Sequence, residues 1–235
     1  MDHYLYLFIN LGSIAIPLIA GFDKRLQFEK QWRFLFPSFF LTMLVFIPWD
    51  MIKTNLGVWG FNPRYLLGVY VGNLPIEEWL FFITVPYACI FTYHSLNHLV
   101  KKDLFGSYSN QLAVLLASLL LLVGLMNLGR LYTSITFLST GIFLLVLALK
   151  FKPSFLGRFF LMYMVTLLPF FLVDGMLTGS FIPEEVVFYD NSQNLGVRIG
   201  TIPIEDMVYS FLLLLMSLCW YEWLQSRYKQ KVSNQ

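Results

Sequence analysis

The chain repeats one heptapeptide: residues 72–78 read GNLPIEE, and residues 200–206 read GTIPIED. Asp50 precedes the first copy and Asp174 the second, and each aspartate ends an apolar segment that opens with Arg-Phe. A repeat of this length and order indicates a duplicated structural unit. The sequence therefore predicts two copies of one unit, each with an aspartate and a pair of adjacent acids.

The composition indicates a membrane protein. Of the 235 residues, 57% are hydrophobic and 13% are charged, whereas soluble domains average about 25% charged residues. A chain this apolar has too few polar side chains to cover a soluble domain, so lipid is the expected surrounding. The net charge of +2 comes without a basic cluster, which argues against a nucleic-acid partner. We expect an all-α integral membrane protein.

Seven apolar segments approach the length of about 20 residues that a helix needs to cross the hydrocarbon core. The first begins near Met1 without a basic region, so we expect a retained helix and not a cleaved signal peptide. The fourth segment joins two matching sets of three. The segments are Tyr4–Gly21, Phe34–Trp49, Ile76–Leu96, Gln111–Leu128, Leu131–Leu149, Phe159–Val173 and Ile204–Trp223.

These segments predict two parallel three-helix repeats, at residues 1–106 and 130–235, with a connector helix at 107–129. Units that start four helices apart share one orientation, and an axis along the membrane normal relates them. Their matching ends then lie on the same side of the membrane. Six acids would therefore meet in one cleft: Asp50, Glu77, Glu78, Asp174, Glu205 and Asp206.

The basic residues predict the orientation. Twelve of the 16 Lys and Arg residues fall in loops on one side and four on the other. Basic residues concentrate in cytoplasmic loops, so we expect a multi-pass protein of the cell inner membrane. Its N-terminus would lie outside and its C-terminus in the cytoplasm.

Two interpretations of the acids remain open. Carboxyl groups brought together repel, so some are expected to hold a proton. A protonated carboxyl beside an ionised one can serve as acid and base. Alternatively, the acids after Pro75 and Pro203 only stabilise the first turns of two helices. This alternative explains neither the duplication nor Asp50 and Asp174.

Aromatic side chains surround the acids and are candidates for substrate contact. Aromatic faces can stabilise a cation, although such residues also form ordinary belts at membrane interfaces. The candidates are Trp49, Trp59, Phe81, Phe82 and Tyr209.

Residues 75–82, PIEEWLFF, resemble the Pro-x-Glu-Glu-x-x-Phe-Phe signature of heterodimer-type lycopene cyclases, in the form fused into one chain. The resemblance covers nearly the whole chain. The second copy departs from the signature, because residues 203–210 read PIEDMVYS and keep one aromatic residue. The two halves are therefore expected to do unequal work.

The resemblance implies an isomerase that closes β-type rings without redox change. A carboxylic acid would protonate the terminal double bond of lycopene, the cation would close a six-membered ring, and a base would remove a proton. As a hypothesis, Glu77 and Glu205 are the acid and base, while the other four acids tune them or share protons. Lycopene and the bilayer are the expected partners, and a homo-oligomer or contact with other carotenoid enzymes stays open.

No cofactor is expected. The chain lacks the Gly-rich dinucleotide fingerprint of flavoproteins and an Asp-rich metal motif.

The alternatives to a cyclase are a proton-coupled carrier, whose polar residues should lie near the midplane of the membrane, and a carotenoid-binding protein without chemistry. The segment Ile204–Trp223 contains no lysine, which argues against a retinal protein.

Overall fold

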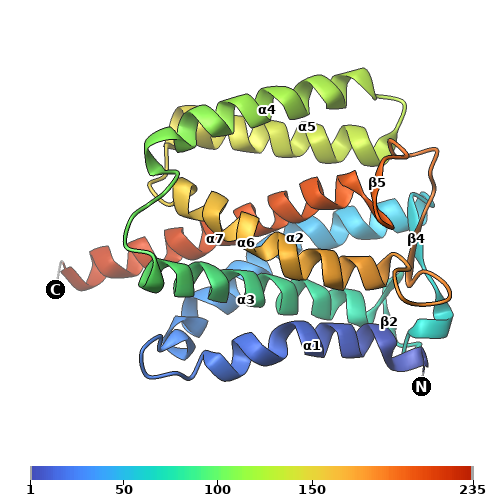
Figure 1. Ribbon diagram of the computed structural model, residues 1–235, viewed down its shortest axis with the longest axis horizontal. Coiled ribbons are helices and arrows are strands. Elements are labelled where there is room, and N and C mark those ends of the chain that lie inside the picture. Colours follow the sequence, from blue (N-terminus) through green and yellow to red (C-terminus); the bar gives the residue numbers. More distant parts are fainter. Residues whose placement is uncertain (1, 234–235) are drawn as a thin grey trace.

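The computed structural model describes residues 2–233, and within them seven long helices run side by side (Figure 1). With the short turns that adjoin them, all seven are long and apolar enough to cross a membrane. The all-α membrane fold class is therefore confirmed. The helices are α1 (Leu5–Ala20), α2 (Trp32–Asn55), α3 (Ile76–Leu99), α4 (Ser109–Met126), α5 (Leu131–Val146), α6 (Leu156–Leu177) and α7 (Ile204–Ser233).

Helices α2 and α6 continue past the apolar segments that predicted them. Asp50 and Asp174 were expected at the helix ends, but each is followed by further helical residues. The apolar pattern marks where the hydrocarbon core ends, whereas the helix continues as long as its backbone is paired. In α2 the extension includes Lys53, which is buried and donates a hydrogen bond from Nζ to the carbonyl of Leu131 at 2.8 Å.

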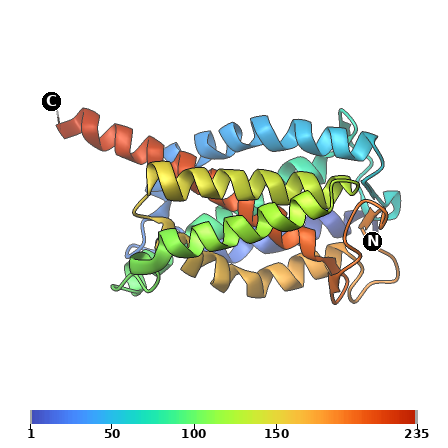
Figure 2. The same cartoon turned by 90° about the horizontal axis from the view of Figure 1, so that it is seen from above.

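Short strands lie at one end of the bundle, opposite the end where α7 extends beyond the other helices (Figures 1 and 2). They occupy the two long loops, and all pairs are antiparallel. The pairs are β1 (Trp59–Phe61) with β4 (Val187–Tyr189), β2 (Tyr70–Val71) with β3 (Leu74–Pro75), and β5 (Arg198–Ile199) with β6 (Ile202–Pro203).

The repeated heptapeptide forms the same hairpin and helix start in both halves. Gly72 has φ +68° and Gly200 has φ +64°, a conformation that glycine adopts without steric cost. Each turn returns the chain directly into α3 or α7. The backbone N–H of Ile76 donates to Val69 at 2.8 Å, and that of Ile204 donates to Val197 at 3.0 Å.

The two halves are interlocked about a two-fold axis. In the β1–β4 pair, Trp59 lies opposite Tyr189 and Phe61 opposite Val187, which is the self-complementary register that two-fold symmetry produces. Helix α2 packs on α7 of the other repeat, and α3 packs on α6. Within the repeats α1 packs on α3 and α5 on α7, while α4 covers α5. The internal repeat predicted from the sequence is confirmed.

Candidate active site

A mostly apolar cavity of about 670 Å³ lies between α1 and α6, with α3 and α7 behind it. At the end of the cavity nearest the strands, four helices each contribute one carboxyl group to the wall. The four acids are Asp50 from α2, Glu78 from α3, Asp174 from α6 and Asp206 from α7. The interlocked repeats therefore bring four of the six predicted acids to one cavity.

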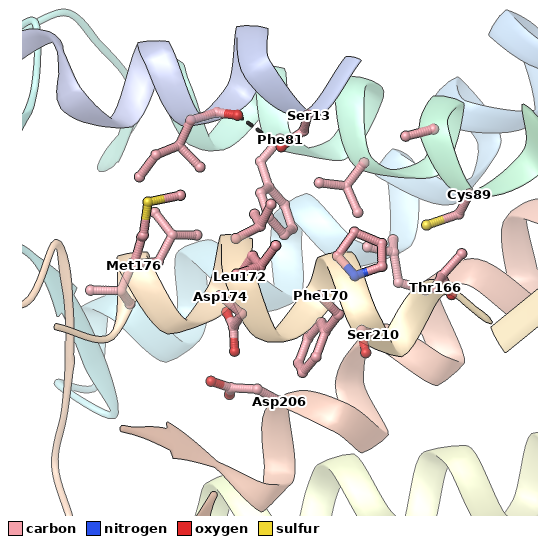
Figure 3. A pocket seen from close by; sticks show the side chains of 18 of the residues that line it. Ser13, Phe81, Cys89, Thr166, Phe170, Leu172, Asp174, Met176, Asp206 and Ser210 are labelled. Atoms are coloured by element: carbon pink, nitrogen blue, oxygen red, sulfur yellow. Dashed lines mark hydrogen bonds between the residues drawn. The ribbon is translucent and has the colours of Figure 1, made fainter. Parts of the chain in front are cut away.

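The four carboxyl groups form two pairs. Asp50 adjoins Glu78, and Asp174 adjoins Asp206, while Oδ2 of Asp50 and Oδ2 of Asp174 are buried without a hydrogen-bond donor. Figure 3 shows Asp174 and Asp206 pointing toward each other from α6 and α7. Two carboxylates have only acceptors, so a hydrogen bond between them requires that one carries a proton. Each pair is therefore suited to hold a proton and a charge side by side.

Tyrosine hydroxyls donate to one acid of each pair. Tyr6 on α1 donates to Glu78, and Tyr132 on α5 donates to Asp206. Tyr189 on β4 also donates to Asp206, at 2.8 Å. Phe61 holds the corresponding place in β1, so Glu78 lacks the second tyrosine.

Sequence reasoning missed Tyr6 and Tyr132. Each follows a leucine at the start of its repeat's first helix, and an alignment of the two repeats through their first helices could have revealed them. Burial, and then the charge of Asp206, raise the pKa of Tyr189 well above its usual value. This hydroxyl therefore remains a hydrogen-bond donor at neutral pH.

Glu77 and Glu205 lie outside the cavity wall and are fully buried. The Oε1 atom of Glu77 accepts the backbone N–H of Leu67 at 2.6 Å, and Oε1 of Glu205 accepts that of Leu195 at 2.8 Å. Thr133 also donates to Glu205, at 2.6 Å. In both repeats the first of the two adjacent acids therefore holds the loop that precedes the hairpin.

The predicted aromatic residues divide into two groups. Trp59, Phe81 and Tyr209 line the cavity beside the carboxyl groups. Trp49 and Phe82 do not, and both pack against the buried ring of Phe46, with ring centroids 5.6 and 6.2 Å away. Only the first three can contact a molecule in the cavity.

The acids are not arranged as a metal site. Among residues 2–233, no three His, Cys, Asp or Glu side chains are grouped so that they could hold a metal ion. The paired carboxyls and their tyrosine donors are instead equipped to give and accept protons.

Comparison with models of known protein families gives a match. The family model described as lycopene cyclase matches residues 3–96 and 129–224. The two matched segments correspond to the two repeats, and together they cover most of the chain. A search of curated proteins and a search of solved structures each found no match.

Proposed function

The chain belongs to the lycopene cyclase family, and from this premise we propose that it cyclises the end groups of a linear carotene such as lycopene by acid–base chemistry. One observation carries the proposal: two carboxyl pairs lie at the end of an apolar cavity between membrane-spanning helices. A hydrocarbon end group has no polar atoms that carboxyl groups could bind. Carboxyl groups in such a cavity are therefore best explained as proton donors and acceptors in a reaction of that end group.

Glu78 is the proposed acid. It accepts one tyrosine hydrogen bond and adjoins Asp50, with which it can share a proton. Its neutral carboxyl group donates a proton to the terminal double bond of the end group and leaves a tertiary cation. The electrons of the neighbouring double bond then form the carbon–carbon bond that closes the six-membered ring.

Asp206 is the proposed base. It accepts hydrogen bonds from both Tyr132 and Tyr189, and donated hydrogen bonds favour the ionised form of a carboxylate. Its carboxylate removes a proton from the cyclic cation, and a ring double bond forms. One proton enters the substrate and one leaves, so the product is an isomer and the enzyme is an isomerase of the intramolecular lyase type.

The cavity wall protects the cation between these steps. Trp59, Phe81 and Tyr209 present aromatic rings beside the acids, and aromatic faces attract a cation. The remaining wall is mostly apolar, and exclusion of water prevents its addition to the reactive intermediate. These features support ring closure over hydration.

We expect the rings formed to be of the β type. We also expect the protein to lie in the cell inner membrane, with its N-terminus outside and its C-terminus in the cytoplasm. The acids then lie toward the outer face, because Glu78 and Asp206 lie in the first turns of α3 and α7, and both helices start at the end of the bundle opposite the C-terminal end of α7 (Figure 1).

Expression in a bacterial host that accumulates lycopene tests the proposal. The wild-type protein should convert lycopene into ring-containing carotenes of unchanged mass, as chromatography and mass spectrometry would show. Glu78→Gln and Asp206→Asn should each leave lycopene uncyclised while the protein stays in the membrane. Unchanged lycopene with the wild-type protein present in the membrane would refute the proposal.

A further inference from the structure

The cavity forms a long groove that faces the lipid on one side. Its α3 wall extends from Glu78 to Thr92, which is about 20 Å along a helix at 1.5 Å per residue. At its rim, Phe8 and Ile16 on α1 are 57% and 76% exposed, and Leu172 on α6 is 58% exposed. The groove therefore covers a large part of the roughly 30 Å hydrocarbon core and opens between α1 and α6.

The two-fold axis relates this groove to the space between α5 and α2, which is filled. Trp49 takes the place that Val173 has in the groove, and Phe82 takes the place of Ser210. The two large rings pack with Phe46, and Phe143 on α5 joins the same cluster. Larger side chains therefore occupy the volume that is open on the other side.

A hydrogen bond also joins α2 and α5 on the filled side. Lys53 Nζ on α2 donates to the carbonyl oxygen of Leu131 on α5 at 2.8 Å. The corresponding residues on the open side are Leu177 and Leu5, which line the groove. An apolar leucine cannot make this hydrogen bond, so α1 and α6 lack it between their ends.

We propose, on the basis of the cyclase function above, that a linear polyene enters sideways from the bilayer through the groove between α1 and α6. The polyene lies along the helices with one end group at the carboxyl pairs, and the side between α2 and α5 admits none. The protein then holds one end of the substrate at a time. A carotene with two rings requires release and a second entry with the other end first.

A matched pair of tryptophan variants tests this route. Ser13 lines the groove on α1, and Ser139 is its counterpart on α5; each hydroxyl bonds the carbonyl four residues earlier at 2.7 Å. Ser13→Trp and Ser139→Trp therefore gain the same ring and lose the same hydrogen bond to the carbonyl four residues earlier, and Ser139→Trp also loses a longer one to the carbonyl of Thr136 at 3.1 Å. Two readouts are needed: cyclised carotene formed in lycopene-accumulating cells, and total carotene, lycopene and cyclised product together, retained by the purified protein, measured by absorbance.

Ser13→Trp should lower both readouts at least tenfold relative to the wild type, whereas Ser139→Trp should stay within about twofold. Equal losses in both variants, loss in Ser139→Trp alone, or loss in neither would overturn the single route. If a serine variant fails to reach the membrane, Ile16→Trp and its counterpart Ile142→Trp decide the same question. Wild-type protein that retains lycopene without cyclising it would overturn the cyclase function alone, because retention still tests the route.

Discussion

The two repeats place acidic residues at corresponding positions of the backbone, but the side chains that surround these acids differ between the repeats. In the second repeat Asp206 accepts two tyrosine hydroxyls, while in the first repeat Glu78 accepts one. The groove is open where the second repeat contributes Val173, and the matching space is filled where the first contributes Trp49. The symmetry thus brings the carboxyl groups together, and the departures from it distinguish the proposed acid from the proposed base and the proposed entrance from the filled side.

The largest effect is expected when the open side is made like the filled side. Val173→Trp introduces an indole ring in the groove, at the position that corresponds to Trp49 on the filled side. The end group of the substrate then loses its space, so conversion of lycopene should fall more than about hundredfold. Conversion would be measured by pigment chromatography at equal membrane protein levels. Leu168→Trp is the control on the same helix, since Leu168 is exposed outside the groove, and it should convert normally.

A second change removes the extra tyrosine of the second repeat. Tyr189→Phe gives Asp206 the surroundings of Glu78, because Phe61 already occupies the matching place in β1. Hydrogen bonds to charged groups contribute about 1.5–3 kcal/mol, so initial rates should fall about tenfold to hundredfold. The raised pKa of Tyr189 keeps its hydroxyl protonated, and the loss should be the same across the neutral pH range.

Tyr70→Phe is the control for that change. The Tyr70 side chain is exposed, at 47%, and does not line the cavity. A rate equal to wild type in Tyr189→Phe would remove the basis for assigning the base to Asp206.

A third change concerns the loop anchors. Thr133 donates to Glu205, and Leu7 holds the corresponding place in α1, so only the second anchor has this support. Thr133→Val should cost about 1 kcal/mol of stability and lower the midpoint of thermal unfolding in detergent by about 2–4 °C. Product formed per molecule should stay near wild type; a large loss per molecule would mean that Glu205 takes part in the chemistry.

The smallest effect is expected at two exposed ion pairs of Arg64, a residue of the first repeat. Arg64 contacts Asp2 at 2.8 Å and Glu184 at 3.5 Å, and the second repeat has Ser192 in its place. Exposed ion pairs contribute little and are screened by salt. Arg64→Ala should leave lycopene conversion unchanged and lower thermal stability only slightly, with the difference vanishing in high salt.

The sequence predicted the helices and the repeat because both depend on local pattern. Seven apolar segments and two copies of one heptapeptide were enough to place Asp50 and Asp174 on the same side. The choice between Glu77 and Glu78 was not available from the pattern. Neighbouring residues on a helix point about 100° apart, and which of them faces the cavity depends on packing between the repeats.

The tyrosine donors and the closed side depend even more on tertiary structure. Tyr6 lies 72 residues from Glu78 along the chain, and aromatic residues are common in any membrane protein. Trp49 and Phe82 were expected to contact substrate because they flank the acids in sequence. The sequence alone does not show that they lie on the filled side, because this position depends on the two-fold axis that relates them to Val173 and Ser210.

The central claim concerns the two adjacent acids of each repeated heptapeptide. The second acid, Glu78 or Asp206, carries the chemistry, and the first acid, Glu77 or Glu205, stabilises the fold. The most direct test of this claim is the amount of cyclised carotene formed per membrane-inserted molecule in four variants: Glu77→Gln, Glu78→Gln, Glu205→Gln and Asp206→Asn. We predict that Glu78→Gln and Asp206→Asn reach wild-type levels in the membrane and form no rings. Glu77→Gln and Glu205→Gln should accumulate less protein but retain activity per molecule. Full activity in Glu78→Gln and Asp206→Asn, with none in well-accumulated Glu77→Gln and Glu205→Gln, would contradict the account.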